Sequence, residues 1–258
     1  MDTATRAVIF GLFGLAFGSF VTVLVHRTPR HETVVSGRSR CPSCGATITA
    51  RDNLPVVSYL LLRGRCRSCG AGISPLYPLT ELITAGLFAA AGAAFPDPYV
   101  AALMGVFLAL LLAMTLTDLR ERLIPNAVVY PGLVVFAGGL GLGALLHRDV
   151  NLAGGLEGLL VFGGSLFLVA LIVPHGMGMG DVKLAALIGL VVGSRGFPSV
   201  MVAVGLGILA GGLGATLALL AGRSRKSAMP FGPFLAGGAA AATFAGPWIA
   251  HAYLGLAH

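Results

Sequence analysis

Charged side chains are scarce in this sequence, and acidic ones are the scarcest. Only 10% of the 258 residues are charged, whereas 56% are hydrophobic. Soluble domains carry about 25% charged residues, so this chain lacks the polar groups that would cover its apolar content. The same composition excludes collagen, a disordered chain and a secreted disulfide scaffold. We therefore expect an integral membrane protein, in which the 38 glycines let helices approach one another closely.

Apolar stretches of the length needed to cross a bilayer, about 20 residues, recur along the chain. They predict an all-α polytopic membrane protein with about eight transmembrane helices, at 6–25, 79–95, 99–117, 127–146, 153–173, 181–194, 199–221 and 231–255. The sixth is short for a span. One polar insertion separates the first two helices, and its glycines and prolines predict a turn-rich structure with short strands.

Basic residues are concentrated in that insertion. Between His26 and Pro75 there are eight arginines against Glu32 and Asp52, which accounts for most of the net charge of +7. Loops rich in lysine and arginine stay on the cytoplasmic side of a membrane. With the insertion inside, the alternation of spans leaves only Arg6, Arg148 and Arg195 outside. The sequence thus predicts an inner-membrane protein with both termini outside.

The insertion also holds all four cysteines, as two Cys-x-x-Cys pairs that are each followed by glycine: Cys41, Cys44, Cys66 and Cys69. Four thiolates at this spacing suit one tetrahedral zinc ion, and a complete set of four protein ligands indicates a structural role. Two disulfides are the alternative, which a cytoplasmic placement disfavours. The neighbouring arginines raise the possibility of nucleic-acid binding, but the loop has few aromatic residues on which bases could stack. We expect no nucleic-acid partner.

Carboxylates within or beside a membrane are costly to hold and are functional candidates. Asp118 ends the third predicted helix, and Asp181 opens the sixth after glycines 176, 178 and 180. The predicted topology brings both acids to the cytoplasmic face, where one acid can keep a proton while the other acts as a base on water. Gly178 and Gly180 would let a substrate backbone approach Asp181. Lys183 either influences the charge of the two acids or contacts lipid headgroups.

Other interpretations of these acids stay open. Asp118 can pair with a neighbouring arginine while Asp181 caps a helix, or both can bind ions in a transporter. Most remaining acids are expected to be solvated or to sit at helix starts stabilised by the helix dipole: Asp2, Glu32, Asp52, Glu81, Asp97, Asp149 and Glu157.

The ordered combination of these motifs resembles the bacterial type IV prepilin peptidases, which are membrane aspartic peptidases of the Gly-x-Gly-Asp class. The resemblance covers nearly the whole chain. It rests on these segments: Gly18-Ser19-Phe20, Val25-His26-Arg27, the two cysteine pairs, Asn53-Leu54-Pro55, Tyr77-Pro78 with Glu81, Asp118 with Ile124-Pro125-Asn126, residues 178–184, and Pro230-Phe231-Gly232-Pro233-Phe234.

The resemblance implies that Asp118 and Asp181 are the catalytic pair and that the cysteines hold a structural zinc. It implies three parts: a first helix (1–26), a cytoplasmic zinc-binding domain (27–78) and a transmembrane peptidase core (79–258). The substrate would be a prepilin or pseudopilin precursor with a short basic leader. After cleavage the family methylates the new N-terminal amine with S-adenosylmethionine, for which the sequence shows no glycine-rich nucleotide loop.

Some residues depart from the family pattern. Asn126 stands where many members have Asp, and Met179 where they have an aromatic residue. The arginine-rich insertion should repel a basic leader, and Glu32, Glu81 and Glu121 are candidate counter-charges. The alternatives are a peptidase without methyltransferase activity and an ion transporter. The sequence gives no oligomeric state.

Overall fold

The computed structural model describes residues 1–34, 39–173, 178–222 and 230–254. Within these ranges the secondary structure is helical, and six helices are long and apolar enough to cross a membrane. An all-helical membrane fold is therefore confirmed. Each of the eight predicted stretches overlaps a helix, but the count of eight spans stays a prediction, because only six meet the length and hydropathy that a span requires.

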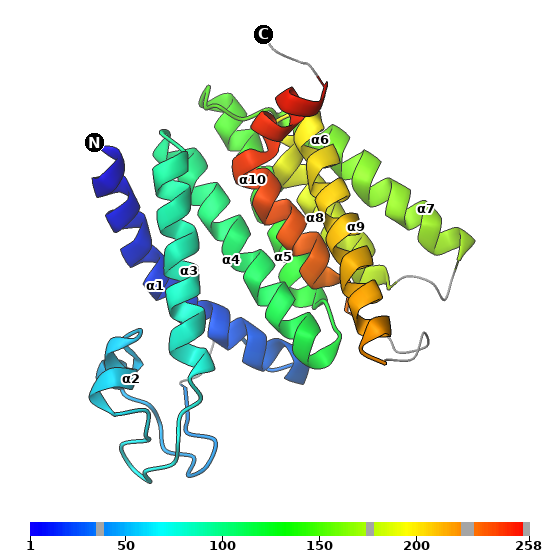
Figure 1. The fold of residues 1–258 in the computed structure, drawn as a ribbon. Helices are drawn as coiled ribbons and strands as arrows, with labels where there is room; N and C mark the ends of the chain where they lie inside the picture. Colours follow the sequence, from blue (N-terminus) through cyan, green and yellow to red (C-terminus); the bar gives the residue numbers. More distant parts are fainter. Residues whose placement is uncertain (35–38, 174–177, 223–229, 255–258) are drawn as a thin grey trace. The chain divides into compact units, whose positions relative to one another are not determined.

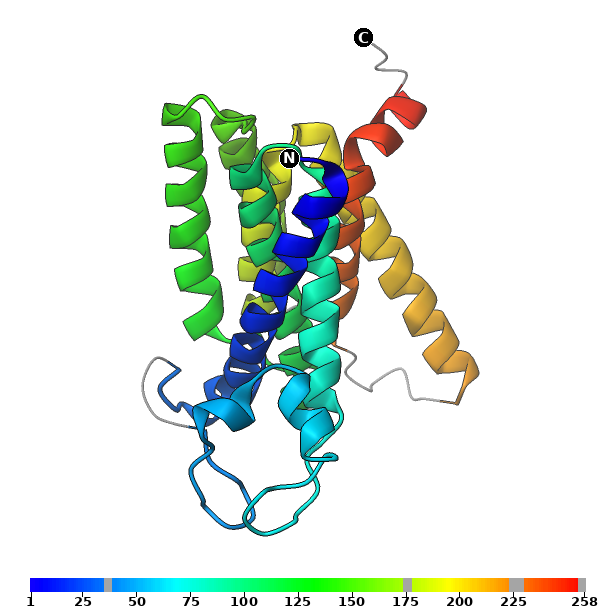
Figure 2. The ribbon, with the colours of Figure 1, turned by 90° about the vertical axis from the view of Figure 1, so that its left-hand side faces the viewer.

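The chain forms two compact units, residues 1–113 and 114–258. In the first unit, α1 (Thr3–Arg27) lies along α3 (Leu76–Ala94), as Figures 1 and 2 show. Glycines allow this close approach. A Cβ on Gly14 would lie 2.7 Å from the Cα of Ala85, and one on Gly18 would lie 2.6 Å from the Cα of Glu81. The two backbones are thus nearly in contact at both levels.

The polar insertion lies at the N-terminal end of α3 (Figure 2). It contains η1 (Thr28–Arg30), η2 (Ala50–Asn53) and α2 (Val57–Leu61), which are joined by turns. The expected short strands are reduced to two single antiparallel bridges among the described residues, Arg40 with Thr47 and Arg65 with Gly72. Each bridge closes a loop around one cysteine pair, and a loop that short leaves no room for a longer ladder.

The second unit begins within α4 (Pro98–Glu121), which starts in the first unit. Its other helices are α5 (Asn126–Leu145), α6 (Leu152–Gly158), the π-helical turn η3 (Leu159–Gly163), α7 (Gly164–Ile172), α8 (Met179–Gly193), α9 (Phe197–Leu220) and α10 (Gly232–Leu254). Together α6, η3 and α7 form one continuous helical stretch that is long enough to be a span.

The short helix α8 lies at the centre of the second unit, in contact with α5, α6, α7, α9 and α10 (Figure 1). From Leu184 onward its side chains are apolar all round, and Leu184, Leu187, Ile188 and Leu190 are completely buried. A helix of this composition is expected inside a bundle rather than at its surface. The burial fixes α8 from several sides and thereby positions its first turn.

Candidate active site and metal centre

The two predicted acids lie in the second unit, at the end of one helix and the start of another. Asp118 is in the last turn of α4, and Asp181 is in the first turn of α8. They are close enough to interact electrostatically. The Asp118 side chain is buried, whereas that of Asp181 is partly exposed. The structure thus brings together two carboxylates that are distant in sequence.

Asp118 is held by a backbone group that the sequence did not reveal. The amide of Gly232, at the start of α10, donates a hydrogen bond of 3.1 Å to the Oδ2 atom of Asp118. A Cβ at position 232 would lie 2.7 Å from that oxygen and 3.3 Å from the Cδ1 of Ile124. The backbone amide donates the hydrogen bond, and glycine leaves the carboxylate the space that a Cβ would occupy. The only signal in the sequence was the glycine between two Pro-Phe steps.

The glycines beside Asp181 have different surroundings. A Cβ on Gly180 would lie 3.0 Å from the Cβ of Ile124, so this glycine lets α8 approach the segment after α4. A Cβ on Gly178 would lie 3.5 Å from the Oδ2 atom of Asp181, beside the carboxylate itself. Gly178 thus adjoins the carboxylate of Asp181, whereas Gly180 lies against Ile124. Gly176 lies outside the described residues.

Lys183 is directed to α5. Its Nζ atom donates a hydrogen bond of 2.9 Å to the Oδ1 atom of Asn126 and lies 5.0 Å from the centre of the Tyr130 ring. The contact joins α8 to α5 by an amide and a cation–π interaction. Lys183 thereby anchors the helix that carries Asp181.

The four cysteines converge in the first unit. Their sulfur atoms all lie within 4.8 Å of one another, and the sulfurs of Cys41 and Cys69 are 3.9 Å apart. A zinc–sulfur distance of about 2.3 Å in a tetrahedron places sulfurs about 3.8 Å apart. The thiols are free, and this separation is far beyond disulfide length, about 2.05 Å. The cluster has the donors and the spacing of a metal site.

The two cysteine pairs form matching turns. Gly45 and Gly70 both have a φ of +71° and donate hydrogen bonds of 2.9 Å to the carbonyls of Cys41 and Cys66. Backbone conformations with positive φ favour glycine, which explains the glycine after each pair. Each turn directs backbone amides toward sulfur, and each ends in one of the antiparallel bridges.

Backbone amides lower the pKa of one cysteine of the cluster, whereas neighbouring sulfurs and burial raise the pKa of another. The amides of Cys44 and Ser43 lower the pKa of Cys41 to about 6. The amide of Ala71 lowers the pKa of Cys69, but the neighbouring sulfurs and burial outweigh it and raise that pKa to about 11. Thiolates this close repel one another, and a bound cation relieves that repulsion.

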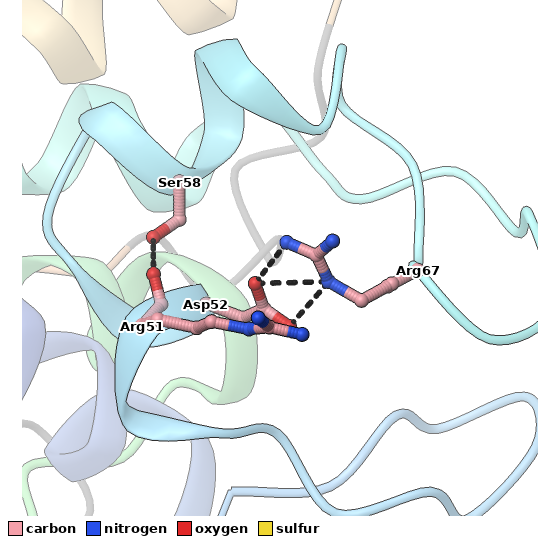
Figure 3. A network of polar contacts seen from close by, with 4 residues as sticks. All are labelled: Arg51, Asp52, Ser58 and Arg67. Carbon is pink, nitrogen blue, oxygen red and sulfur yellow. Dashed lines mark hydrogen bonds and ion pairs between the residues drawn. The ribbon is translucent and has the colours of Figure 1, made fainter.

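A polar network connects the second cysteine turn to the rest of the insertion (Figure 3). Arg67 donates hydrogen bonds to both carboxylate oxygens of Asp52, at 2.6–3.1 Å. The Ser58 hydroxyl donates to the carbonyl of Arg51 at 3.0 Å. The hydrogen bonds from Arg67 hold the pKa of Asp52 below its ordinary value of 3.8.

Glu81 corrects the expectation of a carboxylate at a helix start. It lies beyond the first turn of α3 and is only 8% exposed, and its Oε2 atom accepts a hydrogen bond of 2.7 Å from the amide of Val56. Glu81 and Asp118 are the only acids among the buried residues that the structure describes. The sequence did not reveal the burial of Glu81, because the hydrogen-bond donor lies in the insertion and the helix that packs against Glu81 is α1.

Family models match two parts of the chain. Residues 12–95 match the bacterial peptidase A24 N-terminal domain, and residues 105–216 match the type IV leader peptidase family. No solved structure matches the chain significantly.

Curated relatives match almost the whole chain. A protein of Bacillus subtilis (strain 168) is 36% identical over 252 residues, which cover 96% of this chain and 98% of the relative. A protein of Burkholderia pseudomallei (strain K96243) is also 36% identical, over 95% of this chain and 87% of the relative. Both are named prepilin leader peptidase/N-methyltransferase. Matches this extensive establish that the chain belongs to the type IV leader peptidase family.

Proposed function

We propose that this protein is a prepilin leader peptidase and N-methyltransferase. It removes the short basic leader from type IV prepilin-like precursors and then methylates the new N-terminal residue. Relatives that match the chain from end to end carry both activities in their name. The observation that carries the peptidase assignment is the pair of Asp118 and Asp181, which interact within one helical bundle.

The pair supplies the acid and the base that peptide hydrolysis requires. One carboxylate takes a proton from the attacking water, while the other, protonated, donates to the nitrogen of the leaving peptide. Because two interacting acids share their protons, they act as one titrating unit. The Gly232 amide fixes one oxygen of Asp118, and Lys183 anchors the helix that carries Asp181. Gly178 leaves room for the substrate backbone at the carboxylate.

The four cysteines hold a structural zinc ion in this proposal. Sulfur spacing close to that of a tetrahedral zinc site supports the assignment. Four thiolates fill the coordination shell, so the ion has no open position for water or substrate. It stabilises the fold of the insertion, and no chemical step passes through it.

The methyl donor is S-adenosylmethionine, a proposal that rests on the names of the relatives alone. We further propose that the protein lies in the inner membrane with the acids and the insertion on the cytoplasmic side and both termini outside. The excess of basic residues in the insertion supports this orientation.

The test is to incubate the purified protein with a prepilin and S-adenosylmethionine and to follow the mass of the product. We expect the wild type to yield mature, methylated pilin, and Asp118→Asn and Asp181→Asn to leave the precursor intact. Unchanged cleavage by either variant would refute the catalytic pair. Cleaved product without the methyl mass would remove the methyltransferase activity alone. Ion transport is not favoured, because the matching relatives are named as enzymes.

A further inference from the structure

The first unit contains a buried acid that the proposed peptide hydrolysis does not use. Glu81 is about as buried as Asp118, with exposed fractions of 8% and 6%. Burial of a carboxylate is costly unless a counter-charge or hydrogen bonds compensate it. The compensation at Glu81 is a single hydrogen bond, from the amide of Val56. A buried acid with so little compensation near a membrane surface is a candidate binding group.

The basic side chains at the end of α1 do not neutralise Glu81. Arg30 donates to the backbone carbonyl of His26, and Arg27 donates to that of Thr33 at 3.0 Å. Among the residues that the structure describes, no lysine, arginine or histidine forms an ion pair or hydrogen bond with Glu81. The carboxylate can therefore pair with a cation from outside the chain.

The second carboxylate oxygen is open to such a cation. Across the described part of the chain, the only buried side-chain nitrogen or oxygen without a hydrogen-bond partner is the Nε atom of Arg195. The Oε1 atom of Glu81 accepts no hydrogen bond from the described residues and is not completely buried. Tyr77 precedes Glu81 by one turn of α3, and its ring meets the His26 ring edge-on, with the centroids 6.0 Å apart.

The surrounding backbone is strained to keep the carboxylate in place. Val56 has φ +59° and ψ −47°, a conformation that β-branched residues rarely adopt. Such strain costs about 1–3 kcal/mol and is typical of functional sites. On the opposite side, Gly18 of α1 touches the backbone of Glu81, where any larger residue would collide. Two separate segments thus fix the position of one acid.

We infer that Glu81 binds a cationic nitrogen of the substrate, an ammonium or guanidinium group. The inference rests on the proposed function, which supplies two such groups: a basic side chain of the leader, and the α-ammonium that cleavage frees. Either would find at Glu81 a negative charge inside an otherwise arginine-rich part of the protein, which should repel cations elsewhere. Glu81 is a binding residue and takes no part in breaking the peptide bond.

The experiment uses the full-length protein with the Glu81→Gln substitution, which removes the charge but keeps an oxygen for the Val56 amide. Glu157→Gln is the control, because it removes the same charge from an exposed position in α6 that has no part in the proposed mechanism. Kinetics are measured with a precursor that has its basic leader, a precursor whose leader residues are neutral, and a mature pilin peptide with a free N-terminus. Thermal unfolding and metal content report on the fold.

Two results support the inference and identify the source of the cation. If the leader provides it, Glu81→Gln raises the KM for the basic-leader precursor about tenfold with kcat unchanged, and the neutral-leader precursor no longer distinguishes the variant from the wild type. If the new N-terminus provides it, cleavage is unchanged and the KM of the mature peptide for methylation rises by a similar factor. Glu157→Gln leaves all three KM values unchanged.

Equal KM values for Glu81→Gln and wild type with all three substrates would overturn the inference, as would the same shift in Glu157→Gln. If Glu81→Gln does not fold, Glu81→Asp provides the second test. It keeps the charge but withdraws it by one methylene, and the KM for one cationic substrate should still rise. An unchanged KM there would also refute the inference. Failure of the proposed function is distinguishable, because the wild type would then process no precursor.

Discussion

Gly232 provides a direct test of how Asp118 is positioned. In Gly232→Ala the new Cβ would lie 2.7 Å from the Oδ2 atom of Asp118, whereas ordinary contacts of a Cβ begin near 3.4 Å. The carboxylate is the free end of a side chain and can rotate away, so the helices need not move. The substitution should therefore displace the acid while leaving the fold intact.

The size of the effect follows from this displacement. A retreat of about 0.7 Å would stretch the hydrogen bond from the Gly232 amide, now 3.1 Å, beyond the range of a real hydrogen bond. A hydrogen bond to a charged group contributes about 1.5–3 kcal/mol, and misplacing a catalytic group by about 1 Å costs about 100-fold in rate. We expect kcat for prepilin cleavage to fall about 10- to 100-fold, with little change in KM.

The assay is steady-state cleavage of a prepilin by purified Gly232→Ala, with Gly237→Ala as the matched control. Gly237 lies on the same helix, α10, and no atom lies within 4 Å of a Cβ built there. The control should retain wild-type kcat, and both variants should unfold at a similar temperature. Wild-type kcat in Gly232→Ala, or an equal loss in both variants, would refute the assigned role of the Gly232 amide.

Three further predictions follow from other contacts. Asn126→Asp should give Lys183 a charged partner and raise the free energy of unfolding by about 0.5 kcal/mol, which thermal unfolding measures. Loss of cleavage in this variant would mean that Asp118 and Asp181 need the unpaired charge of Lys183. Cys66→Ser should reduce the metal content below the wild-type value in elemental analysis, whereas full occupancy would exclude Cys66 as a ligand. Asp52→Asn should remove the ion pair between Asp52 and Arg67. That pair stabilises the folded protein above the ordinary pKa of 3.8, and the stabilisation is lost as the pH falls through the lower pKa that Asp52 has in the folded protein. The variant should therefore unfold more easily than the wild type at neutral pH but match it in strong acid, and equal stability at neutral pH would contradict this.

The helices could be predicted from the sequence because their signal is local. Each is a long apolar run between polar turns, and bilayer thickness sets the length. The two Cys-x-x-Cys pairs were equally visible, since the spacing within each pair is a property of one turn. Asp118 and Asp181 stood out because acids are rare in apolar surroundings. What these features share is that neighbouring residues alone determine them.

Contacts between distant segments were not predictable. The donor to Asp118 is 114 residues away in the sequence, at a glycine that any turn could contain. The burial of Glu81 depends on the unusual φ of Val56 and on the glycine of α1 that lies against it. Gly180 also lies against a distant residue, Ile124. None of these contacts has a periodic or compositional signature.

The two buried acids are held in the same way, although they belong to different units. Asp118 and Glu81 each accept one hydrogen bond from a backbone amide, Gly232 or Val56, and no basic side chain pairs with either among the described residues. A backbone amide fixes the position of a carboxylate without cancelling its charge. A salt bridge would fix the position and also cancel the charge. Lys183 illustrates the difference, because it lies two residues after Asp181 but bonds to Asn126 on another helix. A chain with so few acids thus holds its two buried carboxylates by backbone amides, without a basic partner among the described residues.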